Sequence, residues 1–161
     1  MTYAVGETLF YPNHGAALIE GIETRQVNGE ARAYLVLRIA AENGLVVRVP
    51  SVNLERIGVR DVIDGDGIEQ VLEVLRAAPA GESSTWSHRH RVNAEKLRSG
   101  SVVRVAEVVR DLGRRRRAGH LSTAEGRTLA KARRILMSEL AHCGQAHQDQ
   151  AQKVLDEVLA C

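Results

Sequence analysis

The spacing of apolar residues changes once along this chain, near residue 65, and this change limits the folds available to it. Residues 34–39 place Leu35, Leu37 and Ile39 on one face and Tyr34, Val36 and Arg38 on the other, as a strand does. Farther on, Ile68, Val71, Leu72 and Leu75 are spaced as on one side of a helix. The sequence therefore predicts an α+β fold of two domains, with a sheet first and helices after it.

The first domain is predicted to consist of short strands joined by tight turns. We expect strands at residues 8–11, 16–27, 31–40 and 45–49, separated by Pro12-Asn13-His14-Gly15, Asn28-Gly29 and Glu42-Asn43-Gly44. Asn28-Gly29 favours a type I′ hairpin because both residues tolerate positive φ. Four or five strands cannot leave open edges without cost, so we expect a small antiparallel half-barrel over residues 1–55, then a linker at 56–63.

Residues 64–161 are predicted to form a compact bundle of about five α-helices. The first ends before Pro79 and is followed by a polar connector over residues 80–85. A helix containing Trp86 is expected to stop at Gly100, and the next carries residues 114–117, all arginine, at its end. Ser122 and Glu125 have capping-box spacing and predict the start of another helix. A last helix follows Gly144.

The charges of this chain are strongly segregated although its net charge is only +2. Residues 1–60 are neutral, residues 61–85 carry −5, residues 86–134 carry +10 and residues 135–161 carry −3. A local excess of this size is typical of a surface that binds a polyanion.

Signals for catalysis, metal binding and membrane insertion are weak in this sequence. It has no Gly-x-x-x-x-Gly-Lys loop, no Gly-x-Ser-x-Gly elbow and no dinucleotide fingerprint, and we predict no enzyme activity and no cofactor. His88 with His90, or His142, Cys143 and His147, lack a closing set of ligands, so no metal is predicted. No run approaches the roughly 18 apolar residues of a membrane span, and two free cysteines suit the cytoplasm.

Trp86 is the most informative single residue, and two interpretations of it are open. A lone tryptophan is commonly part of a core. Here, however, Ser83, Ser84 and Thr85 precede it and residues 87–91 are all polar or charged. An aromatic ring at a helix start among cations is suited to wedging against bases while the helix contacts phosphate.

Arginine and lysine residues supply the remaining candidate binding residues. Each group, taken alone, is also explained by ordinary exposure to solvent. Arg114 and Arg115 could end a solvated helix, and Arg127, Lys131 and Arg134 could form its neighbour's soluble face. Their presence with Arg89, Arg91 and Trp86 in one basic segment favours nucleic-acid contact. In the sheet, Arg25, Arg38 and Arg48 occupy positions that ordinarily face solvent.

Several motifs together resemble the CarD family of bacterial RNA polymerase-binding transcription regulators. In the first half these are Val5-Gly6-Glu7-Thr8, Tyr11-Pro12-Asn13-His14-Gly15-Ala16, Tyr34-Leu35-Val36-Leu37, Val47-Arg48-Val49-Pro50 and Gly58-Val59-Arg60-Asp61. In the second half they are Trp86-Ser87, Glu95-Lys96-Leu97, residues 105–112 and Leu129-Ala130-Lys131-Ala132-Arg133. The matching motifs occur in the same order as in the family, and they cover essentially the whole chain.

The resemblance implies a Tudor-like first domain that docks on the β subunit lobe of RNA polymerase by strand-to-strand contact. Arg25, Gln26, Val27 and Arg48 match the docking positions. It also implies that the helical domain meets promoter DNA at the upstream fork of the bubble. There the family's tryptophan wedges into the minor groove with little sequence specificity.

The predicted DNA-binding residues are carried by the helical domain: Trp86, His88, Arg89, Arg91, Arg114, Arg115, Arg127, Lys131 and Arg134. The sequence departs from the family pattern at His88 and His90, where a basic and an aromatic residue are common, and at Gly113. Neutral histidine carries no charge, so the departure at His88 and His90 affects how strongly this helix binds phosphate.

The sequence thus predicts a monomeric, cytoplasmic, nucleoid-associated transcription regulator that binds polymerase and stabilises the open promoter complex. The rival interpretation is a free-standing architectural DNA-binding protein with no polymerase partner.

Overall fold

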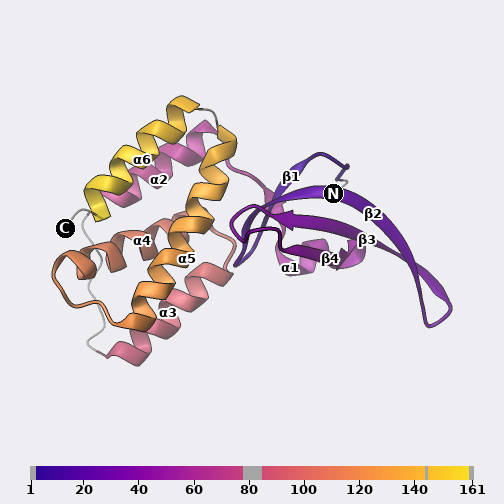
Figure 1. Ribbon diagram of the computed structural model, residues 1–161, viewed down its shortest axis with the longest axis horizontal. Coiled ribbons are helices and arrows are strands. Elements are labelled where there is room, and N and C mark those ends of the chain that lie inside the picture. The colour runs from indigo at the N-terminus through magenta and orange to yellow at the C-terminus, as the bar shows by residue number, and fades with distance from the viewer. Residues whose placement is uncertain (1–2, 78–84, 144, 160–161) are drawn as a thin grey trace.

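Five strands and six α-helices make up the computed structural model, which describes residues 3–77, 85–143 and 145–159. The strands come first and form one sheet, and five of the helices pack together beside it (Figure 1). The α+β, two-part architecture expected from the change of period is confirmed. The polar connector expected at residues 80–85 lies outside the described residues except for Thr85.

The sheet is antiparallel and open. Its strands are β1 (Thr8–Tyr11), β2 (Gly15–Val27), β3 (Glu30–Ile39), β4 (Val46–Pro50) and β5 (Arg60–Asp61), arranged in the order β4-β3-β2-β1-β5. Between β4 and β5 lie a 3₁₀ turn (Ser51–Asn53) and α1 (Leu54–Ile57). Residues 56–63, expected to link two domains, therefore contain the end of α1 and an edge strand paired with β1. The sheet's own core contains Leu9, Ile19, Leu37, Ile39 and Val49, among others.

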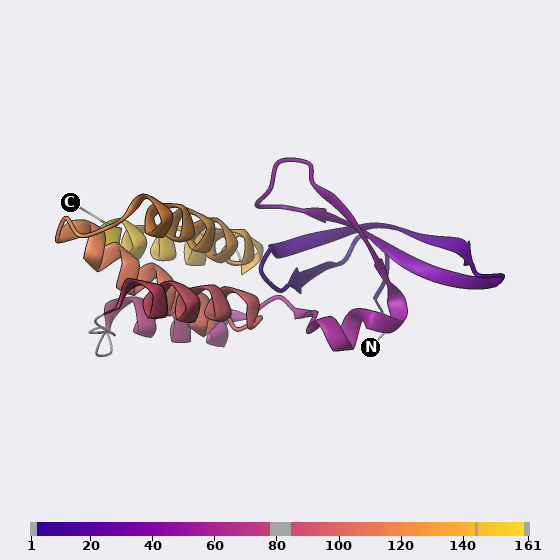
Figure 2. The same ribbon diagram turned by 90° about the horizontal axis from the view of Figure 1, so that it is seen from below.

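The β2–β3 hairpin runs well past the rest of the sheet. β1 pairs with β2 only as far as Leu18, and β4 pairs with β3 only from Tyr34 to Arg38. Residues 24–33, which we call the hairpin arm, thus pair only with each other and extend away from the helices (Figures 1 and 2). At its tip Asn28 and Gly29 have φ of 54° and 81°, so the predicted positive-φ turn is confirmed.

The helical bundle contains α2 (Gly65–Arg76), α3 (Trp86–Arg98), α4 (Val102–Arg117), α5 (Thr123–Leu140) and α6 (Gln145–Leu159), with a 3₁₀ turn (Ala141–Cys143) before α6. Side chains of Asp64, Ser101 and Ser122 cap α2, α4 and α5. The Ser122–Glu125 capping box is present as predicted. A buried core of Leu, Val and Ile residues from all five helices holds the bundle together.

The sheet contacts the bundle through β1, β2 and β5, which meet α5 and the end of α3. Leu9 points into the core of the sheet, and the next residue, Phe10, packs into the core of the bundle, because neighbouring strand residues face opposite sides. The N–H of Asn13 donates to the carbonyl of Leu97 at 3.1 Å, which places the end of α3 against the β1–β2 turn.

Membrane-spanning helices and metal-binding clusters are both absent from the described residues. No helix in this part of the chain is long and apolar enough to cross a membrane. Within the same residues, no group of three or more His, Cys, Asp or Glu side chains is placed to hold a metal ion.

Candidate functional site

The Trp86 ring lies on the surface of the bundle, at the first residue of α3. It is 45% exposed and belongs to neither core. Its Nε1 donates a hydrogen bond to Ser122 Oγ at 3.2 Å, and its ring is stacked on His90 with 5.0 Å between centroids and an 8° tilt. The ring is therefore held in one orientation on the outside of the protein, and the core interpretation of Trp86 does not apply.

Ser122 connects Trp86 to the start of α5. Its hydroxyl oxygen also accepts from the N–H of Glu125 at 3.1 Å, as the N-cap of that helix. Because α3 begins at Trp86 and α5 begins beside Ser122, two helix N-termini meet at the indole. The dipoles of the two helices give this region a positive partial charge.

Glu125, in the first turn of α5, is a buried carboxylate that pairs with two of the predicted DNA-binding residues. Its side chain is 2% exposed, and its Oε2 lies 3.6 Å from Arg89 Nε and 3.5 Å from Arg115 Nε. The arginine side chains are themselves 13% and 19% exposed. Arg89 and Arg115 therefore brace α3 and α4 against α5, so these two cations, which the sequence assigns to DNA, pair with a carboxylate inside the protein.

Other basic groups near Trp86 remain at the surface. Arg91 is exposed and its Nη2 donates to Nδ1 of the exposed His88 at 2.9 Å. Arg114 is only partly exposed, and its Nη2 donates to the carbonyl of Ala77 at 2.6 Å, which joins α4 to the end of α2. Of these three, Arg91 and His88 are the ones best placed for an external partner.

The predicted basic stripe on α5 is formed as expected. Arg127 and Arg134 are exposed and Lys131 is half-buried, whereas Leu129, Ala132 and Leu136 on the opposite side are buried. The 3.6-residue period of an α-helix is enough to place the basic side chains and the buried side chains on opposite sides of α5. The stripe runs along α5 from a point one turn beyond the Trp86–Ser122 contact.

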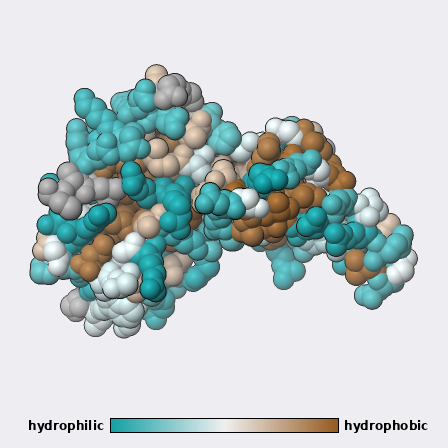
Figure 3. All heavy atoms as spheres, in the orientation of Figure 1, coloured by the Kyte–Doolittle hydropathy of each residue, from teal (hydrophilic) through white to brown (hydrophobic). Residues whose placement is uncertain are grey.

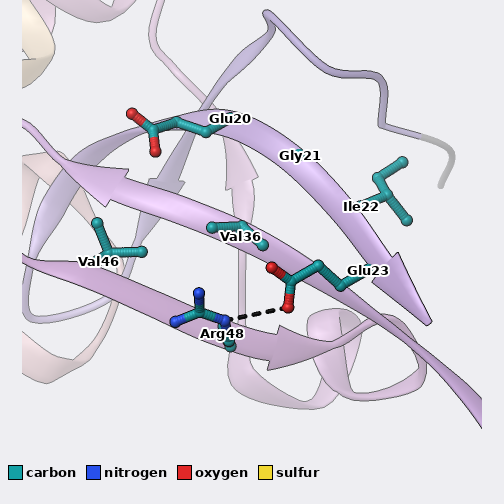
Figure 4. Close-up of a pocket in the computed structure, with 7 residues that line it drawn as sticks. All are labelled: Glu20, Gly21, Ile22, Glu23, Val36, Val46 and Arg48. Carbon is teal, nitrogen blue, oxygen red and sulfur yellow. Dashed lines mark hydrogen bonds and ion pairs between the residues drawn. The ribbon is translucent and has the colours of Figure 1, made fainter. Parts of the chain in front are cut away.

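At the other end of the molecule, Arg25 of β2 and Arg48 of β4 meet at one carboxylate. Arg48 Nε donates to Glu23 Oε2 at 3.1 Å, and Arg25 Nη2 donates to the same oxygen at 3.2 Å. The hydrogen bond from Arg48, with the positive charges of both arginines, holds the pKa of Glu23 below its ordinary value. Figure 4 shows Glu23 and Arg48 facing each other across β3.

Arg48 and Glu23 line a shallow groove on one face of the sheet. The groove measures about 440 Å³ and is lined by Glu20, Gly21, Ile22, Glu23, Val36, Val46 and Arg48. On the face seen in Figure 3, hydrophobic surface gathers over the body of the sheet, and the arm is mostly hydrophilic. Arg48 lies on β4, which is the last strand at one edge of the sheet.

The other two predicted docking residues lie farther out, in the hairpin arm. Gln26 is opposite Ala31 and Val27 is opposite Glu30. Arg25 is opposite Arg32, so two like charges face each other on the ribbon. The structure thus brings Arg25 and Arg48 together and leaves Gln26 and Val27 toward the tip.

Three residues of these sites have no sequence signal for their role. Glu23, Ser122 and Glu125 are distant in sequence from at least one of the residues that they contact: Arg48, Trp86 and Arg89 respectively. The capping box identifies Ser122 and Glu125 as the start of a helix, but nothing local places Trp86 beside them.

An open sheet with Arg48 in a shallow groove, joined to a bundle whose far end carries exposed basic residues, defines a two-domain protein with two separate charged surfaces. Comparison with known proteins narrows this class. A family model described as the CarD-like/TRCF RID domain matches residues 3–63, and one described as the CarD C-terminal domain matches residues 70–156. The chain belongs to the CarD family of transcription regulators, and its sheet domain is Tudor-like.

A relative from Bacillus subtilis (strain 168) supports this assignment. It bears the name "Putative transcription factor YdeB" and is 30% identical over 138 residues, which cover 86% of this chain and 90% of the relative. Both domains therefore align in one continuous match.

Proposed function

We propose that this chain binds RNA polymerase through its sheet domain and promoter DNA through the far end of its bundle, and that it thereby stabilises the open promoter complex. The observation that carries the proposal is the exposed Trp86 ring, held on a basic surface at the end of the bundle away from the sheet. One chain carries both surfaces, so we propose that it acts as a monomer.

The sheet side is suited to a partner that adds a strand. The outer edge of β4 offers backbone N–H and C=O groups, and strand addition is a common way to bind such an edge. Arg48 on that strand, with Arg25 nearby, can pair with carboxylates of the partner. We propose the β subunit lobe as this partner because the family resemblance points to it, with Gln26 and Val27 extending the contact along the arm.

The helical side is suited to the distorted fork of a bubble. Trp86 can pack an apolar ring against an unstacked base step in the minor groove. Its Nε1 is occupied by Ser122, so the ring contributes packing more than base-specific hydrogen bonds. His88, Arg91, Arg114, Arg127, Lys131 and Arg134 supply phosphate contacts, and Arg89 and Arg115 act mainly by holding the Trp86 helix in place.

The mechanism that we propose is differential binding. A chain docked on polymerase is present at a high local concentration near promoter DNA, so modest DNA affinity suffices. If Trp86 fits the open fork better than closed duplex, it shifts the equilibrium toward the open complex by that difference alone.

The test measures open-complex lifetime with purified polymerase, with wild-type protein and with Trp86→Ala, together with pull-down by the isolated β lobe. We expect the lobe to bind both proteins and only the wild type to prolong the lifetime. Binding to promoter DNA without any binding to the lobe would favour the free-standing architectural protein instead. An unchanged lifetime with wild-type protein would refute the proposal.

A further inference from the structure

Arg60 of β5 lies at the junction of the two domains and contacts both of them. Its Nη1 and Nη2 donate to the two carboxylate oxygens of Glu139 on α5, at 2.6 and 2.9 Å. Its Nε donates to the carbonyl of Gly100, between α3 and α4, at 2.7 Å. Its guanidinium also stands 4.0 Å above the ring of Phe10, the residue opposite it on β1. One side chain thus connects the sheet with two places in the bundle.

Glu139 is fully buried, and its hydrogen bonds fix its direction. Besides the two-pronged contact with Arg60, its Oε2 accepts from the N–H of Ile63 at 2.7 Å. Paired N–H···O bonds between a guanidinium and a carboxylate set the angle as well as the distance between the groups. A buried carboxylate without its cation would be strongly disfavoured, so the domains cannot easily swing apart.

Further contacts close the junction on the side of β2. Ser138 Oγ accepts from the N–H of Ala16 at 3.0 Å. Gly15 has φ of 92°, and a Cβ placed there would lie 2.5 Å from Ser138 Oγ. The backbone of β2 therefore approaches α5 as closely as a glycine allows.

We infer that Arg60 and Glu139 are positioning residues, which hold the sheet and the bundle as one body and so fix where Trp86 lies relative to the docking surface. The inference rests on the proposed function. A chain docked at one end brings its other end to a defined place only if the connection is stiff. A flexible connection spreads Trp86 over a larger volume and lowers its effective concentration at the fork.

The test compares Arg60→Met and Glu139→Gln with Arg110→Met. Arg110 is a buried arginine whose partner is Asp111 within α4, so its replacement does not touch the junction. Residual dipolar couplings of backbone amides report the relative orientation of the domains. We expect one alignment tensor for both domains in the wild type and in Arg110→Met, and two tensors in the junction variants.

The functional measurements are made on the same proteins. We expect affinity for the isolated lobe and for duplex promoter DNA to stay at the wild-type value in the junction variants, and open-complex lifetime to fall about tenfold. One shared tensor in both junction variants, or two tensors with a wild-type lifetime, would overturn the inference. Failure of the wild type to prolong the lifetime would refute the proposed function, and the couplings would still decide whether the junction is stiff.

Thermal unfolding checks that each variant folds. Ser138→Ala removes two hydrogen bonds and no charge, and of the two only the one from the Ala16 N–H crosses the junction. This variant therefore serves if Arg60→Met and Glu139→Gln do not fold. It is expected to change the fitted domain orientation and to shorten the lifetime by a smaller factor. Wild-type couplings and a wild-type lifetime in Ser138→Ala would then count against the inference.

Discussion

Each end of this molecule carries one glutamate placed between two arginines, and the two clusters differ in burial. In the sheet, Glu23 contacts Arg25 and Arg48 at 3.2 and 3.1 Å, and its side chain is 39% exposed. In the bundle, Glu125 lies 3.6 and 3.5 Å from Arg89 and Arg115, and its side chain is 2% exposed. The exposed cluster has the shorter distances, yet we expect it to contribute less to stability.

The difference in burial decides what each cluster can do. Water can solvate Glu23 and its arginines whether or not they are paired, so the pairing adds little and can be exchanged for a partner's carboxylates. Glu125 has no such alternative, since leaving a buried charge without its partners is costly. The end that we propose for docking is therefore adaptable, whereas the end that carries Trp86 is organised without a partner.

The largest expected effect is the fall in stability of Glu125→Ala. Removing one member of a buried ion-pair group costs about 3 kcal/mol or more, and the capping-box hydrogen bond from the Ser122 N–H to the Glu125 carboxylate is lost as well. For a chain of this size that corresponds to a fall in melting temperature of about 6–12 °C. Thermal unfolding by circular dichroism measures it, with Glu23→Ala as the matched control. Equal melting temperatures for the two variants would show that burial does not separate the clusters.

Arg48→Glu tests the adaptable end. Charge reversal at a central contact brings repulsion or an unpaired charge, at a cost of roughly 2–5 kcal/mol in binding. Affinity for the purified β lobe is then expected to fall from about 30-fold to about 4,000-fold, with the melting temperature unchanged. Arg56→Glu, an exposed reversal on α1, is the control. Wild-type affinity for Arg48→Glu would remove this residue from the interface.

Trp86→Ala tests the organised end. Stacking of an aromatic ring on a base contributes roughly 1–3 kcal/mol, so the ratio of open to closed complex should fall by about fivefold to over a hundredfold. Binding to the lobe should persist, and the melting temperature should stay near that of the wild type because the ring belongs to neither core. A marked drop in melting temperature, or an unchanged lifetime of the open complex, would contradict the wedge.

Local chemistry made much of this fold predictable. The positive-φ turn at Asn28-Gly29, the capping box at Ser122 and the buried side of α5 follow from rules that involve residues only a few positions apart. The exposure of Arg48 likewise follows from strand alternation.

The carboxylate partners were not predictable in this way. Glu23, Glu125 and Glu139 each meet an arginine at least 25 positions away in sequence, and only the packed fold decides which arginine that is. Sequence reasoning therefore counts Arg89 and Arg115 with Arg91 as equal members of one basic surface. In the structure Arg89 and Arg115 are largely buried and Arg91 is exposed, and no pattern of neighbouring residues in the sequence indicates this difference.

A smaller effect is expected from the stripe on α5, changed in the triple variant Arg127→Ala, Lys131→Ala and Arg134→Ala. If these groups neutralise phosphates, DNA affinity weakens in the variant. The slope of log affinity against log salt concentration then shrinks by about 0.9 for each phosphate that the variant no longer neutralises. Filter binding of promoter DNA over a range of salt concentrations measures this slope. The same slope as the wild type would mean that the stripe is only a solvated helix face.

The smallest effect is expected from Glu23→Gln, which leaves Arg25 and Arg48 without their internal carboxylate. If that carboxylate competes with the partner, affinity for the lobe should rise by less than about tenfold, and the melting temperature should not change.

Protonation of Glu23 by acid should act in the same direction as Glu23→Gln. Because the folded-state pKa of Glu23 is lowered, its pairing is complete above the ordinary glutamate pKa and is lost as pH falls through the lower folded value. Titration of the lobe at neutral pH and at a pH below the lowered pKa of Glu23, with wild type and Glu23→Gln, measures both effects. Weaker binding by Glu23→Gln at neutral pH would show instead that Glu23 holds the two arginines in their docking geometry, and the exposed cluster would then be as organised as the buried one.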